Sequence, residues 1–148
     1  MKQAYKAVIP AVLATLVLGT AVPALALSNA AVAVSEDSTY GNYLTDENGM
    51  SLYAFNGDKT GKSSCYDTCA RTWPPLLTIG DPQAGNLAEQ SLLGTVKRKD
   101  GQLQVTYDGK PLYYFVEDKA PGDTAGQSVS GYGAKWDLVK PNGQVVHG

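Results

Sequence analysis

The chain has little of the chemistry that enzymes and metal proteins commonly use, with one histidine and two cysteines among 148 residues. The single histidine, His147, lies next to the C-terminus, so a Ser-His-Asp triad would depend on a terminal residue. The sequence also lacks a His-Glu-x2-His zinc motif, a Cys-x2-Cys-His haem motif and a Gly-rich phosphate loop. We therefore expect that the protein is not an enzyme and carries no cofactor.

The chain also has no large excess of charge of either sign. Twelve basic and 14 acidic residues give a net charge of −2, and without residues 1–26, which hold Lys2, Lys6 and no acid, the net charge is −4. A mildly acidic surface argues against nucleic acid or an anionic membrane as the partner. The partner that we expect is an unknown envelope component or a small ligand.

Long hydrophobic runs are absent except near the start. Residues 7–22 are small, apolar and uncharged, they follow Lys2 and Lys6, and Pro23 ends the run before Ala-Leu-Ala at 24–26. This order of segments is typical of a secretory signal peptide. We predict a signal peptide over 1–26 with cleavage after Ala26, no transmembrane segment after cleavage, and a periplasmic or secreted location. Residues 27–38 are expected to form a flexible N-terminal arm.

The most informative pattern is an internal repeat with an offset of 60 residues. Residues 48–59 and 108–119 share the pattern [N/D]-G-x-x-L-Y-x-F-x-x-D-K, and Trp73 and Trp136 follow at loosely matching places. Such self-similarity indicates a duplicated structural unit. We predict one domain over 39–148, with repeat 1 at about 39–78 and repeat 2 at about 94–140. The motif residues are Tyr53, Phe55, Asp58, Tyr113, Phe115 and Asp118.

Each copy of the motif predicts a β-hairpin. The dipeptides Asn-Gly at 48–49 and Asp-Gly at 108–109 accept the positive φ angles of a type I′ turn. In the strand that follows, a two-residue period places Tyr and Phe on one face and Leu52 or Leu112 on the other. We expect the Tyr, Phe and Trp rings to form the core.

The fold class predicted from these signals is mainly β. It consists of two repeated antiparallel β-hairpin and meander units in one compact domain, as either a barrel or a sandwich. Two short helices are expected, at 65–72 after a cap at Ser64 and at 87–93 after a cap at Asn86. Residues 118–135 are Gly-rich and are expected to form a long loop. Further strands are expected at 94–99, 102–107, 111–116, 135–139 and 144–146.

Three features together resemble a known family. They are the Y-x-F-x-x-D motif in both copies, the Cys-x3-Cys segment that runs into Trp-Pro-Pro-Leu at 73–76, and residues 94–101 leading to Pro-Leu-Tyr-Tyr-Phe at 111–115. They are similar to the secreted-repeat family of bacterial predicted lipoproteins and exported proteins of unknown function, over about 39–140. The resemblance implies an extracytoplasmic location and brings no substrate, cofactor or catalytic residue. Many members carry a lipobox cysteine, and this sequence has none near the predicted cleavage site.

Cys65 and Cys69 are expected to form a disulfide, because an even number of cysteines in an exported chain favours pairing. On one helical turn, residues four apart have Cα atoms about 6 Å apart, which is within disulfide range. The alternative is a thiol pair that binds Cu(I) or exchanges electrons, with His147 as a third ligand.

Asp58 and Asp118 end the motif at the same place in both copies. We expect each carboxylate to accept backbone N–H bonds in the turn after the strand. The alternative is a cation site, with Glu117 and Asp123 beside Asp118. The basic triplet at 97–99 is expected at a solvated strand edge.

The function that the sequence favours is an exported, non-catalytic, envelope-associated or binding module of unknown ligand. Recognition is expected through the Gly-rich loop at 119–134, with Tyr132 and Lys135 as the binding residues. The alternative function is a periplasmic copper or thiol-redox accessory protein that uses Cys65 and Cys69.

Overall fold

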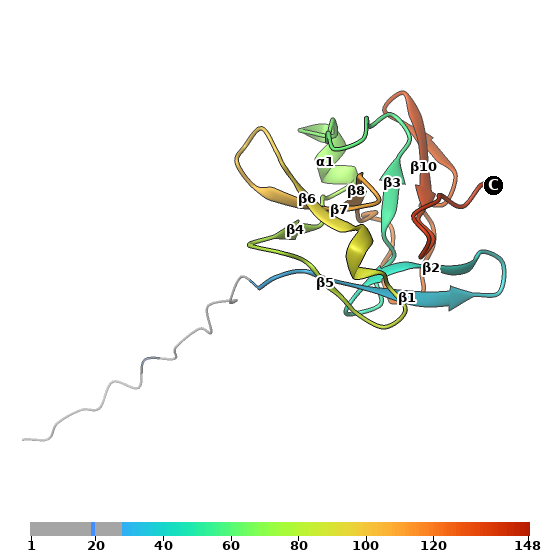
Figure 1. Cartoon of the computed structure of the whole chain (residues 1–148). Helices are drawn as coiled ribbons and strands as arrows, with labels where there is room; N and C mark the ends of the chain where they lie inside the picture. Colours follow the sequence, from blue (N-terminus) through green and yellow to red (C-terminus); the bar gives the residue numbers. More distant parts are fainter. Residues whose placement is uncertain (1–18, 20–27) are drawn as a thin grey trace, which may run out of the picture.

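The computed structural model describes Gly19 and residues 28–148 (Figure 1). The predicted signal peptide lies outside the described residues apart from Gly19, and so does its cleavage site after Ala26. Within the described part of the chain, no helix is both long enough and apolar enough to cross a bilayer.

The described residues form two β-sheets, which confirms the mainly β class. The smaller sheet has the strand order β2-β1-β5, and the larger has the order β4-β7-β8-β3-β10-β9, with β6 also paired to β7. All pairings are antiparallel except that of β1 with β5. The strands are β1 (Ala31–Asp37), β2 (Gly41–Asp46), β3 (Tyr53–Phe55), β4 (Leu77–Thr78), β5 (Gln83–Ala84), β6 (Leu93–Lys97), β7 (Leu103–Tyr107), β8 (Lys110–Tyr113), β9 (Val129–Gly131) and β10 (Ala134–Leu138).

The expected flexible arm at 27–38 is wrong over most of its length, because residues 31–37 form strand β1. β1 pairs with β2 from Val32↔Asp46 to Asp37↔Gly41, and Val32 is fully buried. The alternation Ala-Val-Ala-Val at 31–34 is itself a strand pattern. Small and polar residues on both sides of 31–34 made the segment resemble an irregular arm in the sequence.

The two Gly-containing turns of the repeat differ although their motif is shared. Asp108 (φ 49°) and Gly109 (φ 72°) form the predicted two-residue turn between β7 and β8. In the first copy Gly49 has a positive φ of 82°, and the amide of Asp46 donates to the carbonyl oxygen of Met50 across a three-residue loop. The type I′ turn is therefore confirmed at 108–109 and wrong at 48–49, where one more residue changes the turn.

The two repeats meet along β3 and β8 in a local two-fold arrangement. Tyr53 pairs with Tyr113, its own counterpart in the other repeat, and Ala54 pairs with Leu112. An antiparallel strand that pairs with its own copy, residue against equivalent residue, is related to it by a two-fold axis through that pair.

The same relation holds at the next strands outward. The amide of Leu44 in repeat 1 donates to the carbonyl oxygen of Val139 in repeat 2, at 2.8 Å. The amide of Val105 in repeat 2 donates to the carbonyl oxygen of Leu76 in repeat 1, at 2.9 Å. Each repeat thus completes the hydrogen bonding of the other, so the two units are interlocked.

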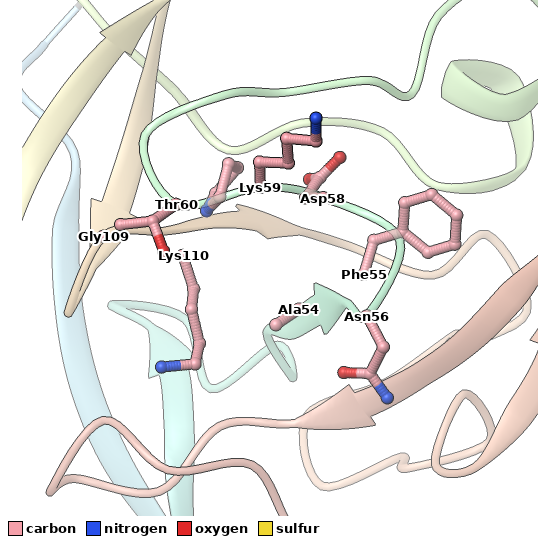
Figure 2. Close-up of a pocket in the computed structure, with 9 residues that line it drawn as sticks. Ala54, Phe55, Asn56, Asp58, Lys59, Thr60, Gly109 and Lys110 are labelled. Carbon is pink, nitrogen blue, oxygen red and sulfur yellow. The ribbon is translucent and has the colours of Figure 1, made fainter.

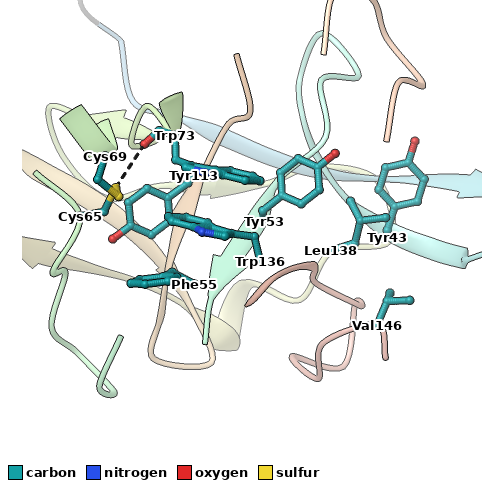
Figure 3. Close-up of a cluster of buried hydrophobic side chains, with 10 residues drawn as sticks. All are labelled: Tyr43, Tyr53, Phe55, Cys65, Cys69, Trp73, Tyr113, Trp136, Leu138 and Val146. Atoms are coloured by element: carbon teal, nitrogen blue, oxygen red, sulfur yellow. Dashed lines mark hydrogen bonds between the residues drawn. A yellow bond between two sulfur atoms is a disulfide. The ribbon is translucent and has the colours of Figure 1, made fainter. Parts of the chain in front are cut away.

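The predicted segregation of side chains to two faces is confirmed. One buried cluster contains the Tyr and Phe of the motif together with both Trp residues, and Figure 3 shows most of its members. The second buried cluster contains the motif leucines with aliphatic residues of the neighbouring strands, among them Leu52, Leu112, Val32, Val105 and Val139.

The two expected helices are shorter than predicted. Helix α1 spans Thr68–Thr72, because Asp67 has a φ of 53° and Ser64 bonds to a carboxylate in the preceding turn instead of capping a helix. Residues 87–93, all of them described, contain only the 3-10 turn η1 (Gln90–Leu92) and then enter β6. Leu87 has a φ of 60°, which is incompatible with a right-handed helix.

The Gly-rich loop after the second motif contacts the aromatic cluster at Gly126. The amide of Gly126 donates to the hydroxyl of Tyr53 at 3.2 Å. A Cβ atom built on Gly126 would lie 2.8 Å from Cζ of Tyr53 and 2.9 Å from Cη2 of Trp73. Only glycine allows the backbone to approach the rings this closely.

This contact predicts the effect of Gly126→Ala. The added methyl group overlaps two buried rings, so we expect the free energy of unfolding to fall by about 1–3 kcal/mol in urea denaturation. The matched control is Gly131→Ala, where the nearest atom is 4.0 Å away and the expected change is within about 0.5 kcal/mol. Equal stability of the two variants would contradict this packing.

Candidate functional site

Four aromatic rings form a continuous stack at the centre of the repeat motif. Trp73 and Trp136 lie parallel, with ring centroids 4.1 Å apart and an interplanar angle of 2°. Phe55 stacks on Trp136 at 4.3 Å, and Phe115 stacks on Trp73 at 4.1 Å. Figure 3 shows Phe55, Trp136 and Trp73 as successive layers. Each motif Phe therefore packs on the Trp of the other repeat.

The motif tyrosines contact this stack edge-on and bond across the repeats. Tyr53 lies against Trp73 with centroids 5.5 Å apart, and Tyr113 lies against Trp136 at 5.1 Å. The hydroxyl of Tyr53 donates to Oδ2 of Asp118, and that of Tyr113 donates to Oδ2 of Asp58, both at 2.7 Å.

The motif carboxylates also accept backbone amides, as expected from their position after the strand. Asp58 Oδ1 accepts the amide of Ser64 at 2.8 Å, and Asp118 Oδ1 accepts the amide of Ala125 at 2.9 Å. Among the described residues there is no cluster of three or more His, Cys, Asp or Glu side chains that could hold a metal ion. The cation site considered for Asp118, Glu117 and Asp123 is therefore not formed.

Burial controls the ionisation of these groups. It raises the pKa of Tyr53 and of Tyr113 well above the ordinary value, and the neighbouring carboxylates raise both further. Burial also raises the pKa of Asp118, although the Tyr53 hydroxyl and the Ala125 amide oppose that shift. The tyrosines thus remain protonated donors to the carboxylates at neutral pH.

Cys65 and Cys69 form the predicted disulfide, with a Cα–Cα distance of 5.2 Å, and both residues are buried. Sγ of Cys65 lies 3.9 Å from the carbonyl oxygen of Trp73 (Figure 3). His147 is exposed beyond the buried Val146. Since the described residues contain no such three-residue ligand group, the structure does not assemble the alternative copper site of the two cysteines and His147.

Arg98 is the main residue that sequence reasoning misplaced. The expected solvated edge holds for Lys97 and Lys99, but Arg98 is only 4% exposed. Its guanidinium donates to Gln104 Oε1 and Ser63 Oγ, and Nη2 donates to the carbonyl oxygen of Cys65 at 2.7 Å. It thereby ties the disulfide segment to β7. A single Arg between two lysines gives no sequence signal for burial.

A family model described as a secreted repeat of unknown function matches the chain twice, at residues 35–77 and 94–140. The chain belongs to this secreted-repeat family. The two matched segments contain all four rings of the stack and both crossed Tyr–Asp bonds, which explains the motif as the contact between the repeats. No curated protein and no solved structure matches the chain.

In this secreted repeat, Tyr132 and Lys135 lie at the turn between β9 and β10. Tyr132 (φ 56°) and Gly133 (φ 93°) form the two-residue turn, and the Tyr132 side chain is 49% exposed. Its hydroxyl lies 2.9 Å from Oγ1 of Thr72, at the end of α1. Lys135 is exposed on β10. The expected binding loop therefore has exposed residues at 119–122, a buried contact at Gly126 and an exposed turn at 132–133.

Replacement of Tyr53 by Phe should keep the ring in the stack and remove the donor to Asp118. We expect the free energy of unfolding to fall by about 1–3 kcal/mol near pH 7, because the buried carboxylate of Asp118 loses its hydrogen-bond donor. The unfolded chain ionises Tyr53 near pH 10 and the folded chain only at higher pH, so wild-type stability falls above pH 10. The difference in free energy of unfolding between wild type and Tyr53→Phe, measured by urea denaturation, should therefore become smaller from pH 8 to pH 11.

The partly exposed Tyr40 supplies the control for this experiment. Tyr40→Phe should change stability by less than about 0.5 kcal/mol. If the difference in free energy of unfolding between wild type and Tyr53→Phe increased with pH, the hydrogen bond from Tyr53 to Asp118 would be contradicted.

The disulfide predicts that the denatured, unreduced protein contains no titratable thiol and that reduction releases two. The double variant Cys65→Ser with Cys69→Ser should have a free energy of unfolding lower by about 2 kcal/mol. The loss is small because the disulfide closes a short loop. After reduction, titration of the wild type with Cu(I) should give no tight stoichiometric binding. One equivalent of bound copper that is lost in His147→Ala would instead establish the copper alternative.

Proposed function

We propose that the chain is exported and acts outside the cytoplasm as a non-catalytic binding module. Its family is described as a secreted repeat, and the basic, apolar and small-residue order of residues 1–26 supports a leader cleaved after Ala26. The Tyr hydroxyls and carboxylates of the motif bond to one another across the repeats. Because these groups serve the architecture, we assign recognition to the surface.

The surface that we propose for recognition surrounds Tyr132. A non-glycine residue in the left-handed region costs about 1 kcal/mol or more, so the exposed Tyr132 adopts this φ against its local conformational preference. Val116, which is 42% exposed, donates its amide to the carbonyl oxygen of Thr72, the residue that the Tyr132 hydroxyl contacts. This places an exposed aromatic ring and an exposed aliphatic side chain around the same end of α1. Tyrosine is enriched in binding surfaces because it combines a large apolar ring with a polar tip.

The partner class that fits this surface is an envelope component, in agreement with an extracytoplasmic location. The single observation that carries the proposal is the half-exposed Tyr132 held in a strained turn against α1. Lys135, on the adjoining strand, adds a positive charge at the same hairpin, within a chain of negative net charge.

Tyr132→Gly tests this surface without endangering the fold, because glycine adopts the left-handed conformation at no steric cost. We expect the variant to be at least as heat-stable as wild type and to lose about tenfold or more in binding to isolated peptidoglycan or envelope glycans, measured by sedimentation and by glycan array. The matched control is Leu87→Gly, since Leu87 is also exposed and left-handed but lies between β5 and η1. Binding of Tyr132→Gly equal to wild type would refute the assigned surface.

A further inference from the structure

A hollow of about 190 Å³ lies between the end of β3 and the turn that joins β7 to β8. Its walls come from both repeats: Ala54 and Asn56 on one side, and Gly109, Lys110 and Pro111 on the other. Figure 2 shows Ala54 between the side chains of Lys110 and Asn56, with Lys59 directed away from it.

The two-fold relation of the repeats identifies the counterpart of this hollow. Ala54 follows the motif Tyr of repeat 1, and Tyr114 holds the same place in repeat 2. The Tyr114 hydroxyl donates to Oδ2 of Asp46 at 2.9 Å, so its ring reaches from β8 to the turn after β2. In repeat 1, the equivalent space runs from Ala54 to the turn after β7, and this is where the hollow lies.

The backbone around the two places also corresponds. The amide of Gly61 donates to the carbonyl oxygen of Gly109 at 2.8 Å, and the amide of Gly122 donates to that of Gly49 at 3.3 Å. In each repeat, the turn before the motif strand therefore accepts a hydrogen bond from the segment that follows the motif in the other repeat. The two places differ in the side chain, a methyl group at 54 and a phenol ring at 114, and in the turn, which is one residue longer in repeat 1.

We propose that the hollow beside Ala54 is a binding site for a small phenol, which takes the position that the Tyr114 ring takes in repeat 2. A cavity of about 150 Å³ holds a benzene ring, so the volume suits one aromatic ring with a small substituent. This site is separate from the proposed surface at Tyr132 and does not depend on it.

Two polar side chains line the hollow, one on either side of Ala54 (Figure 2). Asn56 donates its amide N–H to Asp137 at 2.7 Å, which leaves Oδ1 as an acceptor, and Figure 2 shows that oxygen on the side nearer Lys110. Lys110 Nζ lies 3.3 Å from Oδ2 of Asp108 and has further N–H donors for the phenol oxygen. A phenol in this position would direct its hydroxyl toward the turn after β7 and accept from Lys110, as the Tyr114 hydroxyl is directed toward the turn after β2, while its ring lies beside Ala54.

The probe for this site is p-cresol, which is the tyrosine side chain as a free molecule. We titrate it into the mature chain labelled with ¹⁵N and ¹³C and record amide and methyl NMR spectra. For a ligand of this size we expect a Kd of about 1 mM, saturable shifts at Ala54, Thr60 and Gly109, and nuclear Overhauser effects from the ring protons to the Ala54 methyl group. The Overhauser effects require no variant, so they test the site even where a substitution disturbs the fold.

The decisive variant is Ala54→Tyr, which supplies the ring covalently as repeat 2 does. It should keep the dispersed spectrum of the folded chain and weaken p-cresol binding about tenfold or more. The control is Ala120→Tyr, which adds the same ring at an exposed loop position and should bind p-cresol as wild type does. No saturable shift up to about 10 mM p-cresol, or binding that survives Ala54→Tyr, would overturn the proposal. Neither result bears on envelope binding through Tyr132.

Discussion

The antiparallel pairing of the repeat motif with its own copy is the constraint on which the other contacts depend. Once Tyr53 lies opposite Tyr113, the strands on either side of the pair run outward in equivalent directions. Each motif Phe then reaches the Trp of the other repeat, and each motif Tyr reaches the other Asp. In this chain, each copy of the Y-x-F-x-x-D motif therefore forms half of the interface between the repeats. One repeat supplies ring, hydroxyl and carboxylate, and the second supplies the complementary set.

Much of the local structure could be predicted because it depends on short-range physics. The two-residue period of a strand placed Tyr53 and Phe55 together on one face. The Asp-Gly dipeptide at 108–109 fixed a turn whose φ angles few residues tolerate. The four-residue spacing of Cys65 and Cys69 matched the reach of a disulfide. In each case the deciding forces act between residues that are close in sequence.

The remaining features depend on contacts between the repeats, which no local pattern encodes. No residue near Phe55 in the sequence indicates that its ring packs on Trp136, because Trp73 is much closer to it along the chain. Arg98 is buried because Ser63, Gln104 and the Cys65 carbonyl converge on it from three segments. Leu87 leaves the helical region despite a favourable helix pattern around it, since the chain must turn there into η1 and β6. The correspondence between Ala54 and Tyr114 around the hollow likewise depends on the two-fold relation of the repeats in space.

The crossed packing also sets the order in which this chain acquires its structure during synthesis. A ribosome delivers repeat 1 first, but Phe55 has no stacking partner until Trp136, near the end of the chain, has emerged. The amide of Leu44 likewise waits for the carbonyl group of Val139. Contacts between residues so far apart in sequence slow folding, because the long intervening loop must close first. The first half therefore cannot complete its ring stack or its strand pairing before the second half has been synthesised.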